Sequence, residues 1–376
     1  MPRPIAGAAS GLVRAAVREL VPYEPGKPIE EIERELGLER VVKLASNESP
    51  SGPFPAALEA LERLAPELNR YPDGGAYRLR AALTERHGVR FEEIAPGAGA
   101  DGIVDGLSQA LLGPGDEIVC GWPSFPSYVI DAQKMGAEPR LVPLRDHCYD
   151  LEAMLAAVGS RTKIVYICYP NNPTATANTR AELDAYFASI PERVLTVVDQ
   201  AYFEYAEGPE YVDAVEYLEA GKNVVVLRTF SKIFGLAGLR VGYAVAPAEI
   251  VTVLGKVRRA FDVTSAGQEA ALASLGDTAE LRLRRSANVE AVTELAEILR
   301  SHGFDAIGSP VANFLYVEVG DDARTLFDRL LHQGVIVRPL GGFGAPTAVR
   351  ITAGTSKDHA LLDAALSAVV GDGTRR

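Results

Sequence analysis

Short hydrophobic runs recur along the chain from about residue 94, and several of them do not alternate with polar residues. Strands buried on both faces of a parallel sheet have this pattern, because helices cover both sides of such a sheet. The runs are IVCG (118–121), RLVPL (140–144), KIVYICY (163–169), VLTVVD (194–199), NVVVLRTF (223–230) and VGYAVA (241–246). Segments of helical character, such as 100–112, 151–158 and 180–190, separate them. This alternation predicts an open α/β sheet with helices on both faces.

The pattern changes after about residue 255. A long helical stretch over 281–303 precedes the short strands FLYVEV, VIVRPL and AVRITAG, and a last helix is predicted over 358–370. This order indicates a second, smaller α+β domain. The proline-rich N-terminal segment is expected to pack against that domain or against a neighbouring subunit. We therefore expect an N-terminal arm over 1–48, a large domain over 49–258 and a small domain over 259–376.

Composition and charge exclude several classes of protein. Of the 376 residues, 47% are hydrophobic and 23% are charged, which is typical of a globular chain and not of a disordered one. There are 38 basic and 50 acidic residues, for a net charge of −12. This balance argues against a general nucleic-acid binder or a binder of anionic membranes. A small anionic ligand remains possible, since a few arginines in a cleft can override the overall sign.

The cysteines and histidines indicate neither a disulfide framework nor a metal site. Their spacing includes no CxxC, HxH or HExxH pattern, and no apolar run approaches the roughly 20 residues of a membrane span. Arg14 and Arg18 interrupt the N-terminal stretch, which argues against a secretory signal. A transit peptide stays open as an alternative to an ordinary amphipathic helix. We expect a cytoplasmic enzyme.

Candidate chemical groups follow three neighbouring hydrophobic runs. Asn172 follows KIVYICY, Asp199 ends VLTVVD, and Lys232 follows NVVVLRTF, with Arg240 eight residues further on. Ligands of open α/β sheets bind at the carboxyl ends of the strands, so these side chains are expected to meet there.

An acid and a lysine at adjacent strand ends fit pyridoxal phosphate. The lysine amine can form a Schiff base with the cofactor aldehyde, and a carboxylate can keep the pyridinium nitrogen protonated. The phosphate requires several donors, which Thr229, Ser231 and Arg240 could supply. The sequence GAGAD (97–101) opens a predicted helix, whose exposed amides also favour an anion.

Several motifs resemble those of the fold-type I aminotransferases. SKIFGLAGLR (231–240) is similar to their lysine motif, PNNPT (170–174) to their Asn-Pro-Thr-Gly turn, and DQAYFEY (199–205) to their Asp-Glu-Ala-Tyr segment. Within that group the chain most resembles the histidinol-phosphate aminotransferase family. The stretches that carry this likeness are LVPYEPGKP (20–28), KLASNESP (43–50), RYPDGGAYRLR (70–80), GAGAD, VIVRPLGGFG (335–344) and VRITAG (349–354).

The resemblance implies a large domain with a mostly parallel seven-stranded sheet, a smaller α+β domain, pyridoxal 5'-phosphate as cofactor and a homodimer. It assigns the Schiff-base lysine to Lys232, the pyridinium partner to Asp199 and the stacking aromatic to Phe125. The other cofactor contacts would come from Asn172, Tyr202, Ala100, Asp101, Thr229, Ser231 and Arg240, with Tyr71 reaching the neighbouring subunit's phosphate. The substrate pocket would be lined by Tyr23, Asn47, Asn313, Arg338 and Arg350.

The implied reaction moves an amino group between histidinol phosphate and 2-oxoglutarate. An aromatic amino acid aminotransferase and, less favoured, a decarboxylase or lyase on the same fold stay open as alternatives. The sequence departs from the family motifs at Ala175, which replaces a glycine, and at Gln200, which replaces a glutamate. Phe125 stands where tyrosine is frequent. None of these changes affects the lysine or the aspartate.

Overall fold

A seven-stranded sheet forms the centre of the computed structural model, which describes residues 11–18, 20–22, 26, 28–320 and 323–370. The strand order is β2-β8-β7-β6-β5-β3-β4, and β8 runs antiparallel to both of its neighbours while the remaining pairs are parallel. The strands are β2 (Ile94–Gly97), β3 (Glu117–Trp122), β4 (Glu138–Pro143), β5 (Thr162–Cys168), β6 (Leu195–Asp199), β7 (Val224–Thr229) and β8 (Gly242–Val245). The predicted mostly parallel sheet is confirmed.

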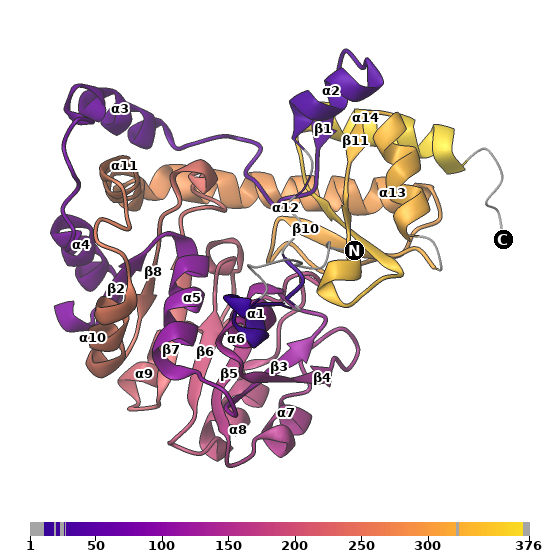
Figure 1. Ribbon diagram of the computed structural model, residues 1–376. Coiled ribbons are helices and arrows are strands. Elements are labelled where there is room, and N and C mark those ends of the chain that lie inside the picture. The colour runs from indigo at the N-terminus through magenta and orange to yellow at the C-terminus, as the bar shows by residue number, and fades with distance from the viewer. Residues whose placement is uncertain (1–10, 19, 23–25, 27, 321–322, 371–376) are drawn as a thin grey trace.

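Helices cover both faces of this sheet (Figure 1). They are α4 (Tyr77–His87), α5 (Gly99–Leu111), α6 (Ser127–Met135), α7 (Leu151–Ala157), α8 (Arg180–Ser189), α9 (Val215–Glu219) and α10 (Ala248–Val257). Two further helices, α3 (Pro55–Leu64) and α11 (Ser265–Gly276), pack on each other, and α11 also packs on α4. Local sequence explains where some of them begin. The Asp150 side chain accepts the amide of Ala153 at the start of α7, and Thr179 forms a capping box with Glu182 at the start of α8.

The central strands are buried on both faces, as the unbroken hydrophobic runs predict. Every residue of β6 and β7 is buried, and so are the last five residues of β5. The edge strand β4 differs, because four of its six residues are exposed. The hydrophobic run over 140–144 therefore marks a strand but not a buried one.

A second, smaller unit contains an antiparallel sheet of order β12-β13-β10-β9 and a parallel pair, β1-β11. Its strands are β1 (Val42–Lys43), β9 (Ala306–Ile307), β10 (Phe314–Glu318), β11 (Val335–Ile336), β12 (Arg338–Pro339) and β13 (Ala348–Thr352). The run VIVRPL thus forms two strands in different sheets rather than one. Because β1 pairs with β11, part of the N-terminal segment adjoins the small unit. The domain boundaries at residues 48 and 258 stay predictions.

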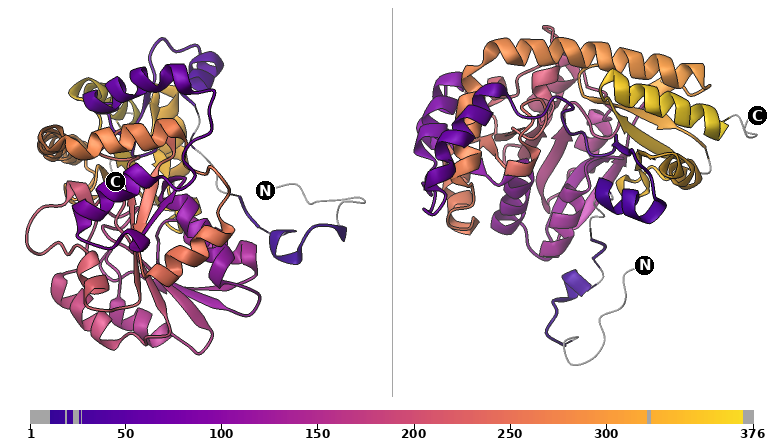
Figure 2. Two further views of the ribbon diagram at one scale, coloured as in Figure 1. Left: turned by 90° about the vertical axis from the view of Figure 1, so that its left-hand side faces the viewer. Right: turned by 90° about the horizontal axis from the view of Figure 1, so that it is seen from above.

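Helices α2 (Ile29–Leu36), α13 (Ala323–His332) and α14 (Ser356–Val370) lie on the small unit, and α1 (Ala15–Arg18) contacts α6. Helix α12 (Thr278–Ser301) is the long orange helix that runs along both units (Figures 1 and 2). It packs on η4 (Phe203–Tyr205) at one end and on β9, β10 and α14 at the other. One helix therefore contacts segments of both units.

No helix in the described part of the chain has the length and apolar character needed to cross a membrane. Among the same residues, no three His, Cys, Asp or Glu side chains gather as they would around a metal ion.

Candidate active site

The predicted catalytic residues lie at one edge of the large sheet. Asn172 follows the end of β5, Asp199 is the last residue of β6, and Lys232 follows the end of β7. Because β8 is antiparallel to β7, β8 begins at this same edge, and Arg240 lies two residues before its first residue, Gly242. The sheet thus brings together residues that are far apart in the sequence.

Lys232 has a half-buried side chain whose amine lies 5.5 Å from the centre of the Tyr202 ring. The loss of hydration lowers the pKa of this amine to about 8, and the positive charges of Arg350 and Arg240 act in the same direction. An amine with such a pKa is partly neutral near physiological pH. Lys232 can therefore act as a nucleophile or as a proton carrier.

Asp199 is buried, and two groups hold its carboxylate. The hydroxyl of Tyr128 donates a hydrogen bond of 2.6 Å to Oδ2, and the backbone amide of Ala201 donates one of 3.0 Å to Oδ1. Burial raises the pKa of Asp199, whereas the bond from Tyr128 lowers it. Sequence reasoning missed Tyr128. The sequence could have indicated Tyr128 by its place three residues after Phe125. The two rings pack edge to face, with their centres 5.5 Å apart.

The hydroxyl of Tyr202 is fixed by Asn47, whose Nδ2 donates to it at 2.8 Å. Asn47 is held in turn by Thr352, because the Thr352 hydroxyl donates to Asn47 Oδ1 at 2.9 Å. Asn47 has a φ of 54°, a left-handed conformation that asparagine tolerates better than most residues. Burial raises the pKa of Tyr202, so the phenol stays protonated.

Asn172 and Arg350 meet across the two units of the chain. Nη1 of Arg350 donates to Asn172 Oδ1 at 2.5 Å, and Nη2 donates to the carbonyl of Ala45 at 2.7 Å. Arg350 is only 4% exposed, and its guanidinium lies 5.3 Å from the centre of the Phe314 ring. The contact occupies the Asn172 carbonyl oxygen, so the amide nitrogen is the atom of Asn172 that can donate to a ligand.

A cradle for an anion lies where α5 begins. Gly99 has a φ of +75°, and a Cβ atom added there would lie 2.8 Å from Nη2 of Arg240. Only glycine therefore lets the guanidinium approach the amides of the first helical turn, which Ala100 and Asp101 also supply. Two hydroxyls complete the cradle, because Arg240 Nη1 donates to Ser231 Oγ at 3.4 Å and Thr229 Oγ1 lies 3.0 Å from the same oxygen.

Arg338 lies beside Arg350, because these two residues are directly opposite each other in the β12–β13 pairing. Its guanidinium is 5.4 Å from the centre of the Phe343 ring. Asn313 is buried, and its Nδ2 donates to the carbonyls of Asn47 and Glu48 at 3.2 and 3.3 Å. Asn313 therefore supports the Asn47 segment through the backbone.

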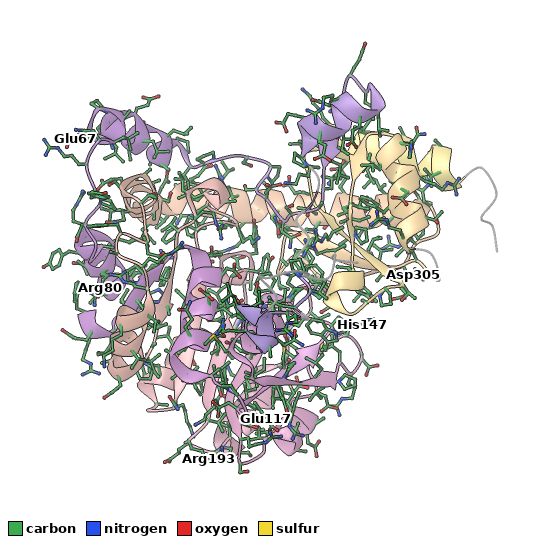
Figure 3. All side chains as sticks on the ribbon, in the orientation of Figure 1. Glu67, Arg80, Glu117, His147, Arg193 and Asp305 are labelled. Atoms are coloured by element: carbon green, nitrogen blue, oxygen red, sulfur yellow. The ribbon has the colours of Figure 1, made fainter. Side chains whose placement is uncertain are left out.

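Phe125 packs on an apolar cluster of the small unit that contains Tyr316, Leu340 and Phe343. The His147 ring approaches Tyr316 at 5.4 Å, at the boundary between the two units (Figure 3). This apolar wall closes the site on the side of the small unit.

Two predicted residues do not join the cluster. Tyr71 is 82% exposed, and its ring stacks on Phe261 at 4.7 Å. Tyr23 lies outside the described residues.

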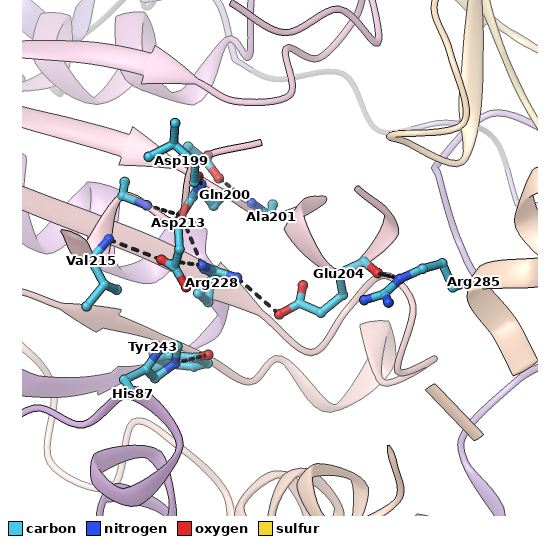
Figure 4. A network of polar contacts seen from close by, with 12 residues as sticks. His87, Asp199, Gln200, Ala201, Glu204, Asp213, Val215, Arg228, Tyr243 and Arg285 are labelled. Atoms are coloured by element: carbon cyan, nitrogen blue, oxygen red, sulfur yellow. Dashed lines mark hydrogen bonds and ion pairs between the residues drawn. The ribbon is translucent and has the colours of Figure 1, made fainter. Parts of the chain in front are cut away.

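The departure at Gln200 leaves the site itself unchanged. Gln200 is the first residue after β6, and its Nε2 donates to the carbonyl of Val212 at 2.8 Å. Its side-chain carbonyl oxygen accepts from Arg228 Nη2 at 3.0 Å, and Arg228 also pairs with Asp213 at 2.8 Å and with Glu204 at 3.5 Å (Figure 4). Gln200 thus belongs to a buried network behind the catalytic edge.

The departure at Ala175 preserves the turn. Ala175 has a φ of 52°, the conformation that suits the glycine expected there, and its amide donates to the carbonyl of Asn171 at 2.8 Å. The turn therefore forms with alanine, at the energetic cost of a left-handed residue.

The donor set fits pyridoxal phosphate. A buried carboxylate suits a ring nitrogen, the cradle at Gly99 and Arg240 suits a phosphate, and Asn172 with Tyr202 suits a ring oxygen. Between them stands an amine of lowered pKa, Lys232.

Comparison with known proteins identifies the class. Residues 39–369 match the family described as Aminotransferase class I and II, so the chain belongs to that family. A histidinol-phosphate aminotransferase of Moorella thermoacetica is 43% identical over 95% of this chain and 92% of its own length. Histidinol-phosphate aminotransferase 2 of Methylococcus capsulatus is 44% identical over 94% of this chain and 97% of its own.

Solved structures agree with the observed fold. The histidinol-phosphate aminotransferase of Sinorhizobium meliloti, determined in complex with pyridoxal-5'-phosphate, superposes with a TM-score of 0.88 at 29% identity and covers 96% of this chain and 97% of its own. An aspartate aminotransferase of Thermus thermophilus with maleate superposes with a TM-score of 0.83 at 24% identity, over 96% and 99% of the two chains. The fold-type I architecture is thus confirmed.

Proposed function

We propose that this enzyme transfers an amino group between histidinol phosphate and 2-oxoglutarate, as a step of histidine biosynthesis, with pyridoxal 5'-phosphate as its cofactor. The observation that carries the proposal is the half-buried Lys232 amine with a pKa of about 8, set between the Asp199 carboxylate and the anion cradle. The curated relatives named above supply the choice of substrate. The metabolites involved are small and water-soluble, and we propose the cytoplasm as the location.

The described residues can hold the cofactor at each of its functional groups. Asp199 would pair with the ring nitrogen, and Phe125 would lie against the ring. Ala100, Asp101, Thr229, Ser231 and Arg240 would hold the phosphate. When bound, the cofactor supplies an aldehyde that reacts with amines and a ring that accepts electrons. The Asn172 amide and the Tyr202 hydroxyl would donate to its ring oxygen.

Lys232 is the proton carrier of the proposed reaction. Once a substrate amine takes its place at the cofactor, the freed amine of Lys232 can accept the proton from the substrate carbon that bears the nitrogen. Because its pKa is about 8, a larger fraction of Lys232 than of an ordinary lysine is in the neutral, proton-accepting form. The same amine can later return the proton to a different carbon atom.

The neighbouring arginines suit the anionic end of histidinol phosphate. Arg338 and Arg350 are adjacent on paired strands, and a guanidinium binds phosphate through two parallel hydrogen bonds. Asn47, Asn313 and Tyr23 are proposed to line the same pocket. The 2-oxoglutarate carboxylate would use the same arginines in the second half of the reaction.

We also propose a homodimer in which Tyr71 reaches the partner's phosphate site. The exposed rings of Tyr71 (82%) and Phe261 (46%) stack on each other, and Leu68 (60%) is exposed three residues before Tyr71. Exposed apolar clusters of this kind favour a protein partner. A second copy of this chain would cover them and complete the site.

The test is a substrate panel with the purified, cofactor-loaded enzyme. Histidinol phosphate, phenylalanine and tyrosine are each offered with 2-oxoglutarate, and glutamate formation is measured. We expect the highest kcat/KM for histidinol phosphate and no turnover by Lys232→Ala. A preference for phenylalanine or tyrosine would favour the aromatic aminotransferase, and release of carbon dioxide would favour a decarboxylase.

A further inference from the structure

Arg284 lies on α12, next to the catalytic edge, and is only 6% exposed. Its guanidinium contacts the main chain of two segments that are distant in sequence. Nη1 donates to the carbonyl of Gly52 at 2.5 Å and to that of Ile233 at 3.2 Å. Nη2 donates to the carbonyl of Pro53 at 3.0 Å. One side chain thus joins the segment that follows Asn47 to the segment that contains Lys232.

These two segments are packed main chain against main chain. Gly235 has a φ of +71°, and a Cβ atom added there would lie 1.9 Å from the carbonyl oxygen of Gly52. The planar guanidinium of Arg284 lies beside this contact, 4.4 Å from the centre of the Phe54 ring. Its third nitrogen, Nε, donates to Glu280 on the same helix at 2.8 Å. The arginine is therefore held from both sides while it bridges the two segments.

Other residues of α12 hold further parts of the site in the same manner. Nδ2 of Asn288 donates to the carbonyls of Pro310 and Ala312, just before Asn313. Nε of Arg285 donates to the carbonyl of Glu204, two residues after Tyr202. The inward-facing residues of α12 thus contact the main chain beside several predicted site residues.

We propose that Arg284 is a positioning residue of the aminotransferase reaction, because it holds the Lys232 segment against the segment that carries Asn47. This inference rests on the proposed function. Arg284 acts through the backbone and not on the substrate. A lysine at this position keeps the charge, but its three donor hydrogens lie on one nitrogen, so it lacks the planar fork that spans the three carbonyls.

The charged groups that influence the Lys232 amine come from four parts of the chain. They are Arg350 on β13, Glu48 after β1, Arg240 before β8 and Asp199 at the end of β6. Arg284→Lys alters none of these charges. A change in the titration of Lys232 in this variant would therefore report a change in its position or hydration.

The first measurement uses the cofactor-free protein. The rate at which it binds pyridoxal phosphate is followed as a function of pH, because only the neutral amine reacts with an aldehyde. For the wild type we expect a midpoint near the lysine pKa of about 8. For Arg284→Lys we expect a higher midpoint, since a displaced and better hydrated amine returns toward the ordinary pKa of a lysine.

The second measurement compares kcat and KM of the loaded enzymes. We expect kcat of Arg284→Lys to fall by about 10- to 100-fold, in line with a misplacement of the reacting group by up to about 1 Å. The KM for histidinol phosphate should change little, because Arg338 and Arg350 are not touched. Arg282→Lys is the matched control, since Arg282 is exposed on the same helix. Glu280→Gln removes the charge of the group that accepts from Nε and leaves an acceptor oxygen in place.

A wild-type midpoint and kcat in a folded Arg284→Lys variant would overturn the inference. Gly235→Ala, which separates the same two segments without altering Arg284, provides the second test and should raise the midpoint as well. If both variants fail to fold, Arg284 is a structural residue and the inference is wrong. If the wild type does not accept histidinol phosphate, the proposed function fails, but the cofactor-binding profile still tests Arg284.

Discussion

The hydrogen bond from Tyr128 to Asp199 gives a prediction whose size follows from the structure. Both side chains are buried, and Tyr128→Phe would leave the Asp199 carboxylate with the amide of Ala201 as its remaining protein donor among the described residues. A hydrogen bond to a charged group contributes about 1.5–3 kcal/mol, and one between neutral groups about 0.5–1.5 kcal/mol. We expect the free energy of unfolding to fall by about 2 kcal/mol when Asp199 is ionised.

The effect should depend on pH, with a definite sign. Burial raises the pKa of Asp199 in the folded protein, so the folded state loses stability as pH rises through that value. The hydrogen bond from Tyr128 opposes this rise in the pKa of Asp199. Without that bond the pKa rises further, so the loss of folding stability continues to a higher pH. The difference between variant and wild type should therefore be larger at about pH 8 than at about pH 5.

The assay is urea unfolding of the cofactor-free proteins at both pH values, followed by circular dichroism. Tyr166→Phe is the matched control, because Tyr166 stacks on Tyr128 at 4.5 Å, while its hydroxyl lies near Ser108 without a well-formed hydrogen bond to any described residue. Its stability should change by less than about 0.5 kcal/mol. A loss for Tyr128→Phe that is equally small, or equal at both pH values, would refute the reasoning.

Three further predictions concern other parts of the site. Gly99→Ala should push Arg240 out of the anion cradle and raise the Kd for pyridoxal phosphate by about 10-fold or more, because a charge-assisted hydrogen bond is weakened. Fluorescence titration measures this Kd, and an unchanged value would contradict the proposed phosphate site. Arg350→Lys should raise the KM for histidinol phosphate by about 10-fold or more, since lysine can neither keep the contacts to Asn172 and Ala45 nor offer further guanidinium hydrogens to the phosphate. A fall in kcat alone would indicate another role for Arg350. Arg228→Met should reduce the free energy of unfolding by about 3–5 kcal/mol, because it leaves the buried Glu204 and nearby Asp213 without their cation. A urea unfolding midpoint equal to that of the wild type would contradict this prediction.

The predicted site residues that the structure brings together share one property: their place follows from the order of strands and motifs. Asp199 ends a buried strand and Lys232 comes shortly after the next one, so an α/β sheet brings them together whatever the details of packing. Arg240 could be expected beside them because of its distance from Lys232 within one motif.

The residues missed depend on packing between distant segments. Arg284 is one of several arginines in an amphipathic helix, and only the packing of α12 on residues 49–54 and 233 distinguishes it from its exposed neighbours. The direct contact of Arg350 with Asn172 likewise requires the two units to be docked. The division of VIVRPL into two strands has the same origin, since β11 pairs with β1 and β12 with β13.

The reversed direction of β8 has a consequence for how this enzyme can vary. A single connection, residues 230–241, leaves β7 and enters β8 at the same edge, and it contains both Lys232 and Arg240. Inserting or deleting a residue between them would shift the amine relative to the guanidinium that we propose holds the cofactor phosphate. The proposed site therefore constrains the length of this connection, which has to keep Lys232 and Arg240 at a fixed separation along the chain.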